Sequence, residues 1–173
     1  TLCSKLQELI QLRQLFGLRS RVHTLCRLLN PLGASTTMQS VFHPSYANTH
    51  HQAARLLGEY NAAVFKGEAG EVEYRPRARL SVSLLRNGQS DTLEIAKTSD
   101  AKDNPGTNPQ LLKDFWEGEY ENDHYEKTVI GTAAIALLTM GEAENHSAAI
   151  VKAKRYWKNR HSQTQPQPQS HSQ

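Results

Sequence analysis

The chain has 173 residues, a formal net charge of +3 and 38% hydrophobic residues, enough for one domain with a hydrophobic core. No apolar run reaches the roughly 18–20 residues of a membrane span, no signal-peptide pattern is seen at the start, and two cysteines without a CxxC pair argue against a zinc ribbon or a disulfide scaffold. We therefore expect a cytoplasmic protein with no membrane partner.

The first 32 residues have the pattern of two helices. Apolar residues recur at helical spacing from Leu2 to Phe16, and Gly17 marks the end of this helix. A second helix is predicted from Ser20 to Leu29, and Asn30-Pro31 ends it.

A parallel strand–helix–strand unit is predicted to follow. A short strand runs from Met38 to Phe42, a helix from Tyr46 to Gly58, and a second strand from Ala62 to Phe65. A glycine-flanked turn over 66–70 ends this strand, and residues 71–74 are predicted to form another short strand. The inward residues expected for the helix are Ala53, Ala54, Leu56 and Leu57.

The middle of the chain predicts a β-hairpin, and the last part predicts three helices. Leu80–Leu84 alternates with period two, Asn87-Gly88 is a strong hairpin signal and Thr92–Ile95 returns, so an antiparallel flap would hang from the parallel unit. Helices are expected at 109–116, 125–140 and 143–160. The inner residues expected for the last of these are Ala148, Ile150, Val151, Tyr156 and Trp157. The predicted fold class is α/β, a mixed sheet flanked by helices, with a disordered polar tail over 161–173.

The chain lacks recognisable catalytic and metal-binding motifs. His50 and His51 are adjacent on a predicted helix and point about 100° apart, so with His43 they are not expected to share a metal ion. No GxSxG motif is present, and the turn over 66–70 lacks the lysine–serine pair of a Walker phosphate loop. We therefore expect no catalytic residue.

Basic residues are unevenly distributed and point to an anionic partner. Lys152–Arg160 has five basic residues and no acid, whereas Asp114–Glu126 has six acids and no base. Arginines alternate over 75–79, so in an extended strand their guanidinium groups would share one face and could bind phosphates. A solvated basic surface is the simpler interpretation of any one cluster, but several clusters in one chain favour nucleic-acid binding. The predicted phosphate contacts are Arg19, Arg21, Arg27, Lys66, Arg75, Arg77 and Arg79.

Several motifs resemble those of one enzyme family, in the same order. The segment Arg19–Pro31 resembles the RTxFNxLGPLxNP region of anthranilate phosphoribosyltransferases. The strand ending Val41–Pro44, the helix after it and the run Val64–Glu73 follow the family's order, and this run resembles the KGEGGE turn of the nucleic-acid-binding YbiB branch. The helix that contains Thr132–Leu137 and the closing helix resemble the family's C-terminus, so the resemblance covers roughly residues 1–160.

The resemblance implies the C-terminal half of a phosphoribosyltransferase-like, nucleoside-phosphorylase-type fold. Residues 1–32 would be helices of the small helical domain that pairs subunits, and residues 33–160 would be the α/β domain. The family's glycine-rich phosphoribosyl-diphosphate loop lies in the other half and has no counterpart here. The family's magnesium-binding Asp-Glu pair falls on Val72 and Glu73, with Glu71 as a partial substitute, so the resemblance implies at most a vestigial metal site.

Three functions are compatible with these patterns. The first is a non-specific DNA- or RNA-binding homodimer with a degraded active site and no cofactor. The alternative is a phosphoribosyltransferase of the tryptophan-biosynthesis type, in which Arg19 would hold an acidic acceptor while Glu71 and Glu73 hold magnesium. The replacement of a family asparagine by His23, and of Gly-Pro by Cys26-Arg27, argues against this alternative and adds positive charge. The third is a half-domain that oligomerises through residues 1–32.

Overall fold

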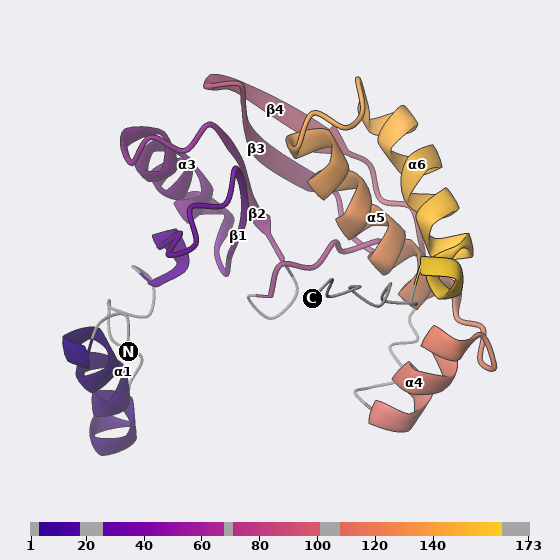
Figure 1. The fold of residues 1–173 in the computed structure, drawn as a ribbon, viewed down its shortest axis with the longest axis horizontal. Helices are drawn as coiled ribbons and strands as arrows, with labels where there is room; N and C mark the ends of the chain where they lie inside the picture. Colours follow the sequence, from indigo (N-terminus) through magenta and orange to yellow (C-terminus); the bar gives the residue numbers. More distant parts are fainter. Residues whose placement is uncertain (1–3, 18–25, 68–70, 101–107, 164–173) are drawn as a thin grey trace, which may run out of the picture.

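A computed structural model describes residues 4–17, 26–67, 71–100 and 108–163. Four strands and several helices follow one another along these residues (Figure 1). The elements are α1 (Ser4–Phe16), η1 (Cys26–Leu28), β1 (Thr36–Val41), η2 (Pro44–Tyr46), α3 (Ala47–Leu56), β2 (Asn61–Lys66), β3 (Leu80–Arg86), β4 (Gln89–Ile95), α4 (Pro109–Glu117), α5 (Asp123–Thr139), α6 (His146–Lys158) and η3 (Arg160–Gln163).

The strands form a mixed sheet in the order β1-β2-β3-β4. β1 and β2 are parallel across α3, as the sequence predicts, and β3 runs antiparallel to β2 with Phe65 opposite Val82. The Asn87-Gly88 turn joins β3 to β4 with positive φ angles of 51° and 75°, as this dipeptide favours in a tight hairpin. The hairpin is therefore the antiparallel part of the sheet, attached to the parallel unit through β3, and the predicted mixed sheet is confirmed.

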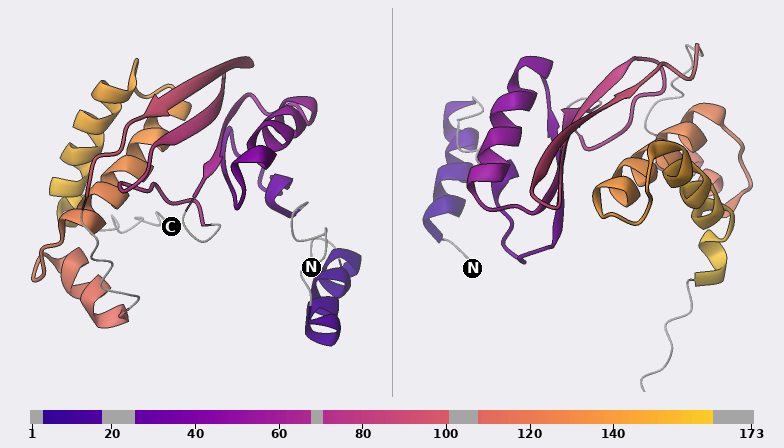
Figure 2. Two further views of the ribbon diagram at one scale, coloured as in Figure 1. Left: turned by 180° about the vertical axis from the view of Figure 1, so that it is seen from behind. Right: turned by 90° about the horizontal axis from the view of Figure 1, so that it is seen from above.

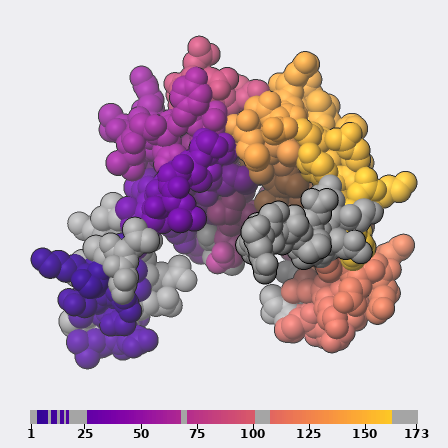
Figure 3. Space-filling view, in the orientation of Figure 1, coloured from indigo at the N-terminus to yellow at the C-terminus, as the bar shows by residue number. Residues whose placement is uncertain are grey.

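Helices cover both faces of the sheet (Figure 2). Because side chains alternate across a strand, Ala63 and Phe65 of β2 face α5 and α6 in the main core, while Ala62 packs with Ala54 of α3 on the other face. α1 and α4 project from this three-layered body in the space-filling view (Figure 3). The assignment of residues 1–32 to a separate domain stays a prediction, and most of its second helix lies outside the described residues.

Two predicted inner faces need correction. In α3 the buried residues are His50, His51 and Ala54. Leu56 lies about 200° around the helix from Ala54 and is 88% exposed, and Leu57 belongs to the turn after the helix and is 64% exposed.

The other correction concerns α6, which turns its small residues inward. Ala149 and Ala153 are buried, because their short side chains let α6 pack closely on α5. Ile150 and Trp157 pack against the core, as predicted. The predicted inner residues Ala148, Val151 and Tyr156 are instead exposed.

In the part of the chain that the structure describes, no helix combines the length and the apolar character needed to cross a membrane.

Candidate functional site

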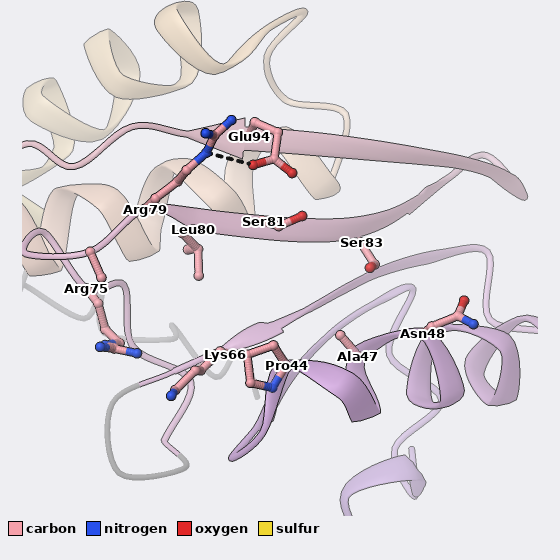
Figure 4. Close-up of a pocket in the computed structure, with 11 residues that line it drawn as sticks. Pro44, Ala47, Asn48, Lys66, Arg75, Arg79, Leu80, Ser81, Ser83 and Glu94 are labelled. Carbon is pink, nitrogen blue, oxygen red and sulfur yellow. Dashed lines mark hydrogen bonds and ion pairs between the residues drawn. The ribbon is translucent and has the colours of Figure 1, made fainter.

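A cleft of about 490 Å³ opens beside the carboxyl ends of the parallel strands β1 and β2 (Figure 4). This is the place where open α/β sheets usually bind ligands. Its walls come from the η2–α3 junction, the end of β2, the segment before β3, and the hairpin strands. The lining residues are Pro44, Ala47, Asn48, Lys66, Arg75, Ala78, Arg79, Leu80, Ser81, Ser83 and Glu94.

Strand alternation explains which side chains reach the cleft. Ala62 at the start of β2 faces α3, so Lys66, four residues further along, projects on the same side of the sheet. Ser81 and Ser83 likewise share one face of β3, opposite the core residue Val82. α3 begins at Ala47 on the rim, so the positive end of its helix dipole lies beside the cleft.

Cationic side chains from two separate segments meet in this cleft. Lys66 ends β2, and Arg75 and Arg79 belong to the segment that leads into β3. Figure 4 shows Lys66 and Arg75 at the same end of the cleft. The Arg79 Nε atom lies 3.4 Å from Glu94 Oε2, and both side chains are largely solvent-accessible, so this ion pair is weak. Among the described residues Lys66 has no ion pair.

The segment over 71–79 is not the extended strand that the alternating arginines predict. It bends and then turns, with the Ala78 amide donating to the Arg75 carbonyl at 3.2 Å. Arg75 and Arg79 line the cleft together, whereas Arg77 is not among the lining residues. The expected row of three guanidinium groups on one strand face is therefore wrong.

Buried Tyr74 determines the path of this segment. Its amide donates to Thr132 Oγ1 at 2.9 Å, and its hydroxyl is hydrogen-bonded to Thr98 Oγ1 at 3.1 Å. The ring lies directly on Gly131 of α5, where a Cβ atom would overlap it. Because the anchor is one residue before Arg75, helix α5 indirectly positions a cation of the cleft.

The other predicted contacts lie elsewhere. Arg27 Nη1 donates to the Ser40 carbonyl at 2.7 Å, near the end of β1 and outside the cleft lining. Arg19 and Arg21 lie outside the described residues.

The residues present do not fit a magnesium site of the kind the resemblance implies. Val72, where the resemblance places the metal-binding Asp, has no side-chain oxygen. Among the described residues no group of three or more His, Cys, Asp or Glu side chains could hold a metal ion.

Comparison with known proteins identifies the relationship. No protein-family model matches the chain. It is 30% identical over 152 residues to anthranilate phosphoribosyltransferase from Syntrophobacter fumaroxidans, covering 82% of this chain and 44% of that protein. It is 29% identical over 156 residues to the Desulfatibacillum aliphaticivorans enzyme, again covering 82% and 44%. An uncharacterized protein from Aquifex aeolicus is 23% identical over 162 residues, covering 87% of this chain and 50% of that one.

Solved structures of anthranilate phosphoribosyltransferases share the fold of this chain. Anthranilate phosphoribosyltransferase from Saccharomyces cerevisiae with 4-fluoroanthranilate aligns with a TM-score of 0.65 at 20% identity, over 89% of this chain and 48% of that one. A Ser121Ala variant of the yeast enzyme with Mg bound gives a TM-score of 0.66 at 17% identity, with the same coverage. The chain belongs to an anthranilate phosphoribosyltransferase-like family. It spans about half the length of the curated relatives it matches.

Membership of the anthranilate phosphoribosyltransferase-like family confirms the resemblance and the α/β fold predicted from the motifs. The choice of the YbiB branch within it stays a prediction. So does the role of each site residue, because the motifs that carry the resemblance include residues outside the described part of the chain.

Sequence reasoning missed the polar wall of the cleft in this anthranilate phosphoribosyltransferase-like chain. Ser81 and Ser83 could have been noticed, since they alternate with buried Val82 and Leu84 and so give β3 one small polar face. Asn48 and Glu94 carry no local signal, because only the packing of α3 beside the hairpin makes them lining residues.

Buried histidines hold α3 on the sheet. His50 Nδ1 is hydrogen-bonded to Gln39 Oε1 at 3.2 Å, and His51 Nε2 to Ser90 Oγ at 3.0 Å. Burial lowers the pKa of both imidazoles, and the nearby positive charges of Arg27 and Arg55 lower the pKa of His50 and His51 respectively. These rings are structural groups that favour the neutral form.

Proposed function

We propose that this chain binds nucleic acid through its phosphates, without sequence preference, using Lys66, Arg75 and Arg79 as the centre of the contact surface. The single observation that carries the proposal is that these three cations, from two separate segments, all line one cleft beside the start of α3. Guanidinium groups bind phosphate oxygens through paired hydrogen bonds, and lysine adds a point charge.

The charges of the cleft support a phosphate ligand. The exposed Arg79–Glu94 pair contributes little to stability, so Arg79 can exchange its partner for a phosphate at small cost. The other predicted contacts, Arg27 and Arg77 with Arg19 and Arg21, would extend the surface along the phosphate chain. A homodimer, as the resemblance implies, would present this surface twice.

The test is the salt dependence of binding to a labelled DNA oligonucleotide. Each phosphate contact that is lost should reduce the slope of log K against log salt concentration by about one. Lys66→Ala and Arg75→Ala should each do so, whereas Lys154→Ala, an exposed lysine on α6 across the sheet, should leave the slope unchanged. Affinity that does not respond to salt would refute the proposal.

The names of the relatives favour one second candidate, transfer of a phosphoribosyl group to anthranilate. It rests on about 30% identity to anthranilate phosphoribosyltransferases over most of this chain. Diphosphate release from phosphoribosyl diphosphate with anthranilate as acceptor tests it. No diphosphate release would exclude transfer to anthranilate.

A further inference from the structure

We propose that Glu94 makes the cleft selective for ribose, so that the chain binds RNA more tightly than DNA of the same sequence. This inference rests on the proposed function and specifies the class of nucleic acid at the same site. The observation behind it is that Lys66 and Arg75 lie at one end of the cleft, whereas Arg79 pairs with Glu94 on the opposite wall. The wall away from Lys66 and Arg75 carries Asn48, Ser83 and, from neighbouring strands, Ser81 and Glu94.

Glu94 and Ser81 lie side by side on this wall. They are directly opposite each other in the antiparallel register of β3 and β4, so their Cβ atoms lie about 5 Å apart. Arg79 Nε lies 3.4 Å from Glu94 Oε2, and about half of the Glu94 side chain remains exposed to a ligand. Figure 4 shows the carboxylate and the Ser81 hydroxyl on neighbouring strands of this wall.

A carboxylate in a phosphate-binding cleft selects what lies beside the phosphate. An ionised carboxylate only accepts hydrogen bonds, and it repels a second phosphate. The part of the ligand that faces Glu94 must therefore bring hydrogen-bond donors. A ribose offers its 2′-hydroxyl, which a deoxyribose lacks, and an acidic side chain on this hydroxyl is a known way to recognise ribose.

The dimensions of the cleft are compatible with one nucleotide. A volume of about 490 Å³ lies within the range of sites that enclose a small organic ligand. The phosphate would lie at the end formed by Lys66 and Arg75, and the sugar would lie between Ser81 and Ser83 with its 2′-hydroxyl toward Glu94. One nucleotide of a longer strand would be bound in the cleft, and its neighbours would follow the basic surface outside.

The experiment compares three oligonucleotides of roughly 12 residues that share one sequence without thymine or uracil: RNA, DNA and 2′-O-methyl RNA. A hydrogen bond to a charged group contributes enough to expect roughly tenfold tighter binding of RNA than of DNA. The 2′-O-methyl RNA keeps the RNA sugar conformation but lacks the 2′-hydroxyl hydrogen that would be donated to Glu94. It should therefore bind as weakly as DNA. Equal affinity for RNA and 2′-O-methyl RNA would overturn the inference.

Variants separate this inference from the proposed function. Glu94→Ala should bring the RNA-to-DNA ratio to about one, and binding of both should strengthen because a negative charge is removed. Asp91→Ala is the matched control, since Asp91 lies on the same strand and points to the opposite face, being paired with core residue Leu84. An unchanged ratio in Glu94→Ala would overturn the inference alone. Binding without salt dependence would refute the proposed function, and the inference with it.

Discussion

The aromatic ring of Tyr74 on Gly131 is the contact that fixes the residues before β3. Tyr74 is 4% exposed, and its amide and hydroxyl bond to threonines from two different parts of the chain. Arg75 follows directly and lines the cleft, so the ring on α5 anchors the backbone next to this cation. A glycine inside a helix costs roughly 1 kcal/mol relative to alanine, and here its missing side chain makes the room that the ring occupies.

We therefore expect Gly131→Ala to destabilise the protein although alanine is the better helix former. The added methyl group overlaps the Tyr74 ring, and overpacking of this kind costs about 1–3 kcal/mol. Urea denaturation measures the loss. The control is a double-mutant cycle with Tyr74→Leu, in which the smaller side chain should remove most of the cost of Gly131→Ala. Strictly additive effects of the two changes would show that the ring is not the cause.

At the scale of elements, the contact between α3 and the sheet is less apolar than the main core, which α5 and α6 form on the other face. Its buried face contains His50 and His51 beside Ala54, and the apolar cluster on this side has three residues, Ala54, Ala62 and Leu85. Hydrogen bonds to Gln39 and Ser90 complete the contact. Because a protonated imidazole is costly at a buried position, the attachment of α3 should depend on pH.

We expect stability to fall as pH decreases from about 7 to 5. The pKa of His50 and His51 is lowered in the folded chain, chiefly by burial, from an ordinary value near 6.5. Below that value the unfolded chain takes up more protons than the folded one, so acid favours unfolding, and the contribution is fully present above it. Burial also lowers the pKa of His146, which adds to the slope in the same direction.

Urea denaturation at several pH values measures this slope. Replacing His50 and His51 together by glutamine should flatten it between pH 7 and 5, leaving the part due to His146. His43→Gln is the matched control because that ring is exposed and lies just before α3. An equal slope in the double variant would place the pH dependence elsewhere in the chain.

Elements with local signals were predictable from the sequence, and those set by distant contacts were not. Period-two alternation and Asn87-Gly88 located β3 and β4 correctly, because both signals lie within a few residues. The path over 71–79 was wrong because it depends on Tyr74 meeting Gly131, a residue far along the chain. The inner face of α6 was wrong because close packing on α5 favoured Ala149 and Ala153 over larger neighbours.

The residues that line the cleft also depend on contacts between distant parts of the chain. Lys66, Arg75 and Arg79 were selected from the sequence as cations, but their meeting depends on where the strands end and on the turn before β3. No local sequence signal predicts that Asn48 and Glu94 line the same cleft. The charged residues of the sequence therefore predict the sign of the ligand's charge. The shape of the ligand that fits the cleft follows only from the packing of the sheet and its helices.

For the whole molecule, the cleft joins parts that otherwise meet only through the sheet. Lys66 comes from β2, Ala47 from the start of α3, and Arg75 from a segment held on α5. A ligand that bridges them binds the folded chain and not the unfolded one, so it must stabilise the fold by mass action. Dispersed cations outside the cleft would give binding with a much smaller effect, because they remain accessible in the unfolded chain.

We expect an oligonucleotide at about 100 times its Kd to stabilise the protein by about 2.7 kcal/mol, which raises Tm by roughly 5–11 °C for a chain of this size. Thermal unfolding with and without the oligonucleotide, at fixed low salt, measures the shift. In Lys66→Ala/Arg75→Ala the shift at the same concentration should nearly disappear, while Lys154→Ala on α6 should keep it. If the double variant keeps both its affinity and the full shift, the stabilising contacts lie outside the cleft, and Arg27 and Arg77 become the residues to test.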